Sequence, residues 1–131
     1  MTRKVNITNI GNMNSYRDLI VWQKSMDLVK KVYLLTTQFP KDELYSLTSQ
    51  VKRSAVSVAS NIAEGYGRQH KREYIHFLQI SRGSLFELQT QLEIAVMVGY
   101  LNTEQLAEVI GIGVEVEKML NSLINKVSNS N

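Results

Sequence analysis

Basic side chains recur in three groups along the chain, at spacings that could direct several of them toward phosphate. The groups are Arg17, Lys24 and Lys31; Lys52 and Arg53; and Arg68, Lys71 and Arg72. Members of the first group are seven residues apart, so they fall on one side of a helix. A lysine or arginine that neutralises a phosphate releases counterions, which gives affinity for nucleic acid without reading bases. These residues are therefore candidate nucleic-acid contacts; the alternative is that they only form water-exposed helix faces.

Glu73 and His76 have the spacing of the carboxylate and histidine ligands that bind iron in some four-helix bundles. Such a site needs a second Glu-x-x-His pair, and the other histidine, His70, lacks that spacing. The sequence also has no G-x-S-x-G turn that would expose a nucleophilic serine. We therefore expect no catalytic residue, no metal and no cofactor, and we predict that the protein is not an enzyme.

Length and composition indicate one folded domain. The chain has 131 residues, of which 44% are hydrophobic and 21% charged, as in a single globular domain. It has no cysteine, which fits a reducing compartment. The N-terminal stretch lacks the apolar run of a signal peptide, and no apolar stretch reaches the roughly 20 residues of a membrane span. We expect a cytoplasmic protein outside the membrane, with a polar tail over residues 1–15 and a folded domain over residues 16–128.

Charge is unevenly distributed between the two parts of the chain. Residues 1–72 contain 12 Lys or Arg against 5 Asp or Glu, whereas residues 73–131 contain 3 against 7. This asymmetry fits a basic surface for a polyanion, and it equally fits pairing between acidic and basic surfaces of neighbouring copies.

Four segments carry apolar residues at every third or fourth position, which is the pattern of amphipathic helices. They cover about residues 18–38, 47–63, 71–98 and 102–127. Phe39-Pro40 ends the first segment, because the residue before a proline is pushed out of the helical region. Since short links leave each helix no partner but its neighbour, the sequence predicts an all-α fold, an antiparallel up-down-up-down four-helix bundle.

Several helix ends have local signals. Gly65 and Gly99 stand where helices two and three should stop, and Gly65 is predicted as a left-handed C-cap. Asn102 with Gln105 three residues later predicts a capping box at the start of the fourth helix. Asn61 falls near the inward side of the second helix, where a buried amide needs a hydrogen bond, so we expect it in a structural network.

The first helix has two apolar stripes. One consists of Leu19, Trp22, Met26, Val29 and Tyr33, and it is predicted to face the core with the lysines nearly opposite. The other lies about 120° round and consists of Val21, Leu28, Val32 and Leu35. One core cannot easily bury both, so the second stripe is a candidate oligomer interface. The alternatives are a broad core face or coverage by the N-terminal tail.

A set of short motifs resembles a known family. They are Tyr16-x-Asp18-Leu19 with Trp22, Phe39-Pro40, Leu47-Thr48-Ser49-Gln50, Ser60-Asn61-Ile62-Ala63-Glu64-Gly65, Gly83-Ser84 with Glu87-Leu88, and Gly99-Tyr100-Leu101. Over about residues 16–127 the chain resembles the bacterial four-helix-bundle family of 23S rRNA intervening-sequence proteins. Ala59 is a departure, because many members have proline there.

The resemblance implies a small all-α protein, without an established role, that is encoded within an insertion in the large-subunit rRNA gene of some bacteria. It also implies a homo-oligomer, specifically a pentameric ring. In a related branch, the accessory proteins of diversity-generating retroelements, a positively charged pentamer associates with reverse transcriptase and nucleic acid. Lys52 and Arg53 stand where the family's basic pair stands.

Two functional hypotheses follow. In the leading one, the protein is a non-enzymatic oligomer that binds RNA or DNA through a basic surface with little sequence specificity, alone or with a protein partner such as a reverse transcriptase. In the alternative, it is a protein-interaction scaffold that does not bind nucleic acid.

Overall fold

Four long helices form the fold in the computed structural model, which describes residues 15–130. They are α1 (Ile20–Thr36), α2 (Leu47–Tyr66), α3 (Lys71–Met97) and α4 (Thr103–Ser128). Two short 3-10 helices, η2 (Tyr16–Asp18) and η3 (Lys41–Glu43), precede α1 and α2. No strand occurs in this part of the chain, and none of its helices has the length and hydropathy to span a membrane.

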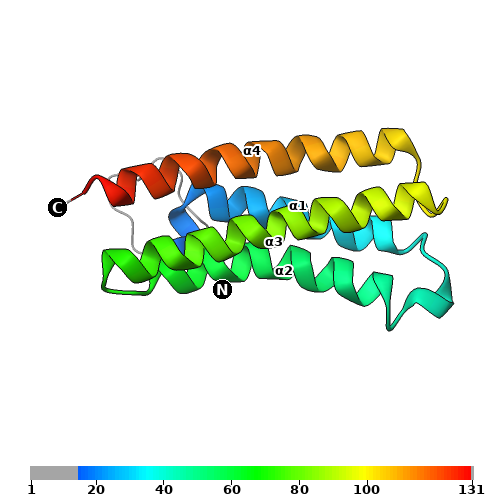
Figure 1. Ribbon diagram of the computed structural model, residues 1–131, viewed down its shortest axis with the longest axis horizontal. Coiled ribbons are helices and arrows are strands. Elements are labelled where there is room, and N and C mark those ends of the chain that lie inside the picture. The colour runs from blue at the N-terminus through cyan, green and yellow to red at the C-terminus, as the bar shows by residue number, and fades with distance from the viewer. Residues whose placement is uncertain (1–14, 131) are drawn as a thin grey trace, which may run out of the picture.

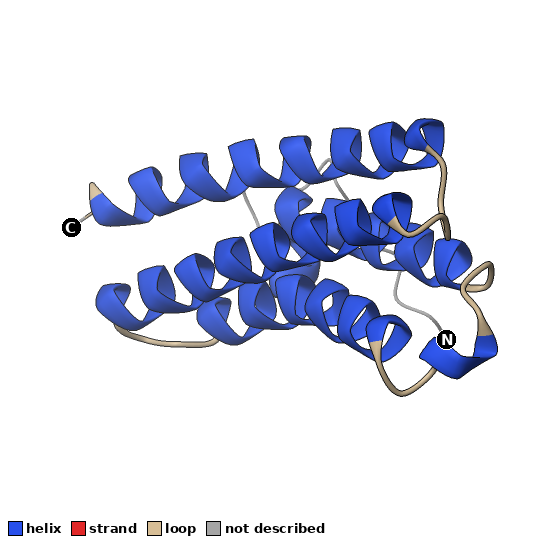
Figure 2. Ribbon diagram, turned by 45° about the vertical axis from the view of Figure 1, so that its right-hand side comes forward, coloured by secondary structure: helices blue, strands red, loops and turns tan. Residues whose placement is uncertain are grey.

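The helices pack side by side with alternating direction (Figure 1). Each helix contacts the next one in sequence, and α4 returns to pack against α1. Short loops join the helix ends, as Figure 2 shows. The predicted antiparallel up-down-up-down four-helix bundle is therefore confirmed.

The described chain begins at a cap. Ser15 accepts a hydrogen bond from the Arg17 N–H at 3.1 Å, and its own N–H donates to Asp18. Residues 1–14, which the sequence predicts as most of a polar tail, lie outside the described residues. Ser15 itself belongs to the folded domain.

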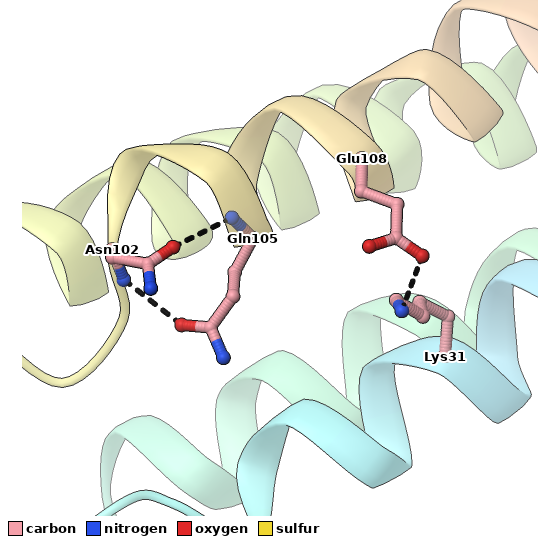
Figure 3. Close-up of polar contacts among 4 residues, drawn as sticks. All are labelled: Lys31, Asn102, Gln105 and Glu108. Carbon is pink, nitrogen blue, oxygen red and sulfur yellow. Dashed lines mark hydrogen bonds and ion pairs between the residues drawn. The ribbon is translucent and has the colours of Figure 1, made fainter.

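The predicted signals at the end of α3 and the start of α4 are confirmed. Gly99 has a φ of +88°, the left-handed conformation that favours glycine, directly after α3. Asn102 accepts from the Gln105 N–H at 2.8 Å, and the Gln105 side chain accepts from the Asn102 N–H at 2.9 Å (Figure 3). The short turn between these helices is thus specified by residues within the turn itself.

Gly65 is not the C-cap of α2, which contradicts the sequence prediction. The helix continues to Tyr66, and Gly65 is buried within it. A Cβ at this position would lie 2.9 Å from Phe77 Cβ and 3.0 Å from Tyr74 Cδ1. Gly65 therefore allows α2 and α3 to approach closely where they meet at their shared loop.

One apolar stripe of α2 and one of α3 form the centre of the core. The buried members are Val51, Ser54, Val58 and Ile62 on α2 and Leu78, Ser81, Leu85, Leu88, Leu92 and Ala95 on α3. Ser81 is fully buried, and its hydroxyl donates to the Val58 carbonyl at 2.7 Å. This bond satisfies a polar group that would otherwise be costly to bury.

Helix α1 faces the core mainly with the second of its two apolar stripes. Val21, Leu28, Val32 and Leu35 are at most 5% exposed within a single chain, whereas Met26 and Tyr33 are each 43% exposed. The prediction that these four residues form an oligomer interface is therefore wrong. Between them lies Ser25, whose hydroxyl donates to the Val21 carbonyl, so the whole stripe can be buried without an unsatisfied polar group. Of the first stripe, Leu19 is buried and Trp22 and Val29 pack against the core, whereas Met26 and Tyr33 stay half exposed. Helix α1 therefore has a broad core face, which was one of the alternatives.

The link between α1 and α2 is tied to the end of α3. The Tyr100 hydroxyl donates to Glu43 Oε2 at 2.6 Å, and the Leu47 N–H donates to Glu43 Oε1 at 3.3 Å. These two donors, Tyr100 first, lower the pKa of Glu43, and the Glu43 carboxylate raises the pKa of Tyr100. Glu43 therefore joins η3, the first turn of α2 and the α3–α4 loop.

Stability should depend on pH through Glu43. Since its pKa is lower in the folded chain than in the unfolded one, its contribution is present above the ordinary value of 4.5 and disappears as the pH falls through the folded pKa. Glu43→Gln is expected to lower the Tm at pH 7, with a difference from the wild type that shrinks below pH 4.5. Thermal unfolding of both proteins across this range measures the effect. The matched control is Glu93→Gln, on the exposed side of α3; an equal pH-dependent difference there would contradict the assignment.

Candidate nucleic-acid interface

Two lysines of α1, Lys24 and Lys31, lie against α4 and are paired with carboxylates. Lys24 Nζ is 2.6 Å from Glu115, and Lys31 Nζ is 2.5 Å from Glu108 (Figure 3). Because the two helices are antiparallel, the seven-residue spacing of the lysines matches that of the glutamates. Glu115 raises the pKa of Lys24, first through the hydrogen bond. The prediction of a free basic row is therefore wrong for Lys24 and Lys31, since the second stripe of α1, about 120° from the stripe that was predicted to face the core, is the one that is buried.

Arg17 stays exposed but does not continue a row along α1. It lies in η2, before α1 begins, and its guanidinium carbon is 4.7 Å from the centre of the Tyr16 ring. A cation over an aromatic face is attracted by the ring quadrupole. Arg17 is thus a separate cation at the start of the bundle.

The basic cluster between α2 and α3 has a mainly structural arrangement. Arg68 pairs with Glu64 at 2.9 Å and stacks 4.8 Å from the centre of the Phe77 ring. Lys71 donates to the carbonyl oxygens of Ser128 and Ser130, which closes the α2–α3 loop onto the C-terminal end of α4. Such contacts suit a cation at the negative end of a helix.

Arg72 differs from its neighbours in the cluster. It is exposed, and within residues 15–130 it forms no ion pair. Of the three predicted cations in this loop, Arg72 is the one whose charge is open to a ligand.

The pair Lys52 and Arg53 lines an open groove of about 460 Å³ at the start of α2. The residues around it come from α1, the α1–α2 link and α2: Tyr33, Leu44, Tyr45, Thr48, Ser49, Lys52, Arg53 and Val56. None of these described residues is acidic. Lys52 Nζ lies 4.9 Å from the centre of the Tyr33 ring. We call this site the Tyr33–Lys52 groove.

The N-terminal end of α2 adds positive potential to this groove. Ser46, the N-cap residue, makes no side-chain capping bond, and the Leu47 N–H is already bonded to Glu43. Of the first turn, the N–H groups of Thr48 and Ser49 therefore remain for an external acceptor. Thr48 and Ser49 in that turn also line the groove. A helix N-terminus favours negative charge, so these groups act in the same direction as Lys52 and Arg53.

A second, more polar pocket adjoins the groove between α2 and α3. It has a volume of about 340 Å³ and shares Arg53 with the groove. Its lining also contains Glu87, which accepts a hydrogen bond from Ser54 at 3.1 Å. A carboxylate disfavours phosphate in this pocket, so the site for an anion lies on the Tyr33–Lys52 side of Arg53.

The predicted structural network around Asn61 is confirmed. Its amide donates to the Ser57 carbonyl at 2.8 Å and to the Ser57 hydroxyl at 2.9 Å. The same hydroxyl lies 2.8 Å from that of Ser84 on α3. These polar contacts hold α2 against α3 behind the candidate site.

The Glu73 and His76 pair has no metal-binding surroundings in the described part of the chain. Glu73 lies 3.9 Å from Arg68, and the His76 ring packs near Phe77. Across residues 15–130 no three His, Asp or Glu side chains gather where they could hold a metal ion.

Two tyrosines of the groove were missed by sequence reasoning. Tyr33 is predicted in the core, although its ring lies at the surface beside Lys52. Tyr45 is in the α1–α2 link and is 93% exposed. The available signal is that Tyr45 comes shortly before a helix with an adjacent Lys-Arg pair, but the direction of a side chain in a link cannot be read from periodicity.

Comparison with known proteins finds chains that are similar to this one in sequence and fold. A family model described as "23S rRNA-intervening sequence protein" matches residues 17–122. One similar solved structure is a protein of unknown function from the S23 ribosomal protein family of Bacteroides thetaiotaomicron. It is 26% identical, with a TM-score of 0.72 over 80% of this chain and 98% of that one. No curated protein matches.

Proposed function

The chain belongs to the family of 23S rRNA-intervening sequence proteins, and from this premise we propose that it is a non-enzymatic bundle that associates with RNA or DNA through the Tyr33–Lys52 groove. The observation that carries the proposal is the groove's charge: two adjacent cations, Lys52 and Arg53, with no acidic residue among the described residues of its lining. Lys24 and Lys31 are not part of the proposed contacts, because Glu115 and Glu108 pair with them.

The contacts are expected to go to the phosphate backbone. Lysine and arginine bind phosphate through charge, and such contacts position a protein without reading sequence. The groove lies across helix α2 and the α1–α2 link, and its two cations are adjacent in the sequence. Affinity should therefore fall steeply with salt and vary little with base sequence.

Salt titration of the wild type and two matched variants tests this function. Lys52→Gln with Arg53→Gln is expected to lower the affinity for a labelled structured RNA about tenfold at low salt, and to reduce the slope of log affinity against log salt by about 2. The control, Lys30→Gln with Lys118→Gln, removes the same charge from exposed lysines of α1 and α4 outside the groove and is expected to change neither value. Equal losses in the two variants, or wild-type binding no tighter than that of an unrelated protein of equal charge, would reject the proposal.

Self-association remains part of the proposal, but through other residues than Val21, Leu28, Val32 and Leu35. The outer side of α3 exposes apolar side chains along its length: Ile80, Phe86, Ile94 and Met97. A Cβ added at Gly83, between them, would meet no atom within 4 Å, so this side is open to a neighbour. Exposed apolar surface of this kind favours association. Light scattering should give a multiple of 14.9 kDa; a monomeric mass would exclude a homo-oligomer.

A further inference from the structure

The side chain of Tyr45 is placed unusually for an aromatic residue in a helical bundle. It is 93% exposed, more than any other large hydrophobic residue in the described part of the chain. Nearby, Tyr33 is 43% exposed, and Lys52 covers its ring. Tyr45 lines the same groove without a ring or cation contact to another described residue. An open aromatic face therefore lies beside two cations.

Phosphate binding alone does not require this face. A duplex presents phosphates on its outside, while its bases are stacked on one another and cannot reach a tyrosine. A single strand presents both groups within one nucleotide, and proteins that bind single strands combine a positive groove with aromatic rings on which bases stack. The Tyr33–Lys52 groove contains both kinds of group.

We infer that the groove binds an unpaired nucleotide, with the base stacked on Tyr45 and the adjacent phosphate on Lys52 and Arg53. Leu44 and Val56 supply apolar contacts for the base or sugar, and the Ser49 hydroxyl can donate to a phosphate oxygen. Tyr33 acts indirectly, because its ring holds the Lys52 ammonium on the groove side. The occupant is therefore single-stranded RNA or DNA.

This inference rests on the proposed function and makes a narrower claim. Association through phosphate predicts similar contacts to single strands and duplexes, whereas stacking predicts a preference that depends on one ring. An acidic peptide could satisfy the two cations but has no flat base for Tyr45. Comparing the affinities for a single strand, a duplex and an acidic peptide therefore distinguishes base stacking from binding through charge alone.

The experiment compares fluorescence anisotropy of a labelled single-stranded RNA of about 12 nucleotides with that of its blunt duplex, both at low salt. Tyr45→Ala is expected to weaken single-strand binding about 5- to 100-fold and to leave duplex binding unchanged. Tyr45→Phe, which keeps the ring and removes the hydroxyl, should retain wild-type affinity. Leu34→Ala, an exposed apolar residue of α1 outside the groove, is the matched control and should change neither affinity.

Each result supports or overturns the inference. Because Tyr45 is almost fully exposed, Tyr45→Ala should keep the wild-type Tm, so lost binding cannot be attributed to unfolding. Unchanged single-strand affinity in Tyr45→Ala, or competition by polyglutamate as effective as that by the single strand, would overturn stacking. If stacking were overturned in this way but Lys52→Gln with Arg53→Gln still lowered the affinity, the proposed function would stand without the stacking of a base on Tyr45. Absence of binding to either nucleic acid would overturn both.

Discussion

Leu28→Ala is expected to lower the free energy of unfolding by about 2–5 kcal/mol. Leu28 is 1% exposed, on the side of α1 that faces the core. Truncation removes buried methyl groups and leaves a cavity that the packed neighbours fill only in part. Urea denaturation followed by far-UV circular dichroism measures the change, with an unchanged slope against denaturant showing that the unfolding reaction is the same.

The matched control is Met26→Ala, two residues earlier on the same helix. Met26 is 43% exposed, so its replacement should change stability by no more than about 0.5 kcal/mol. Both substitutions introduce alanine into the interior of α1, so helix propensity does not explain a difference between them. A larger loss at Met26 than at Leu28 would mean that the stripe predicted from the sequence faces the core.

This contrast shows why α3 was predictable and the orientation of α1 was not. On α3 the leucines 78, 85, 88 and 92 lie on one stripe, and charged residues such as Arg82 and Glu93 interrupt the other sides. On α1 both stripes are apolar, and the hydrophobic period is equally satisfied by either. The choice depends on the partner helices: in the folded chain Ser25 is fully buried against them, and Tyr33 is 43% exposed.

The capping box of α4 could be predicted from the sequence, whereas the partners of the charged residues on α1 could not. Asn102 and Gln105 complete each other's hydrogen bonds within four residues, so their sequence is enough to predict the turn. Lys24 and Lys31 receive their partners from a helix more than 70 residues further along the chain. The seven-residue spacing of Glu108 and Glu115 was the signal for this pairing, but it acquires meaning only when α1 and α4 are known to be neighbours.

The candidate site was predicted in part. Lys52 and Arg53 are where a resemblance to the family indicates them, and the lining of the groove contains no carboxylate. Tyr45 belongs to a link, and the conformation of η3 and of Ser46 decides where its ring lies. A pattern of residue types therefore predicts the charge of the site, and tertiary structure supplies its aromatic component.

Replacing Gly65 is also expected to have a large effect on stability. At this position the better helix propensity of alanine and the steric cost of an added Cβ have opposite effects on the free energy of unfolding. In an ordinary helix interior, replacing glycine with alanine stabilises by roughly 0.5–1 kcal/mol, because alanine loses less backbone entropy. At Gly65 the added Cβ would lie 2.9 Å from Phe77 Cβ and 3.2 Å from the Tyr74 carbonyl oxygen. Neither atom is the mobile end of a side chain, so α2 and α3 would have to move apart.

Gly65→Ala is therefore expected to lower the free energy of unfolding by about 1–3 kcal/mol, the usual cost of overpacking, in spite of the better helix propensity of alanine. The control is Gly111→Ala on α4, where a Cβ would meet no atom within 4 Å, so stability should rise by up to about 1 kcal/mol. Chemical denaturation of both variants measures whether the free energy of unfolding falls in Gly65→Ala and rises in Gly111→Ala. If Gly65→Ala were as stabilising as Gly111→Ala, the helices could not be in close contact at Gly65, and the glycine would act at the end of α2 as the sequence alone predicts.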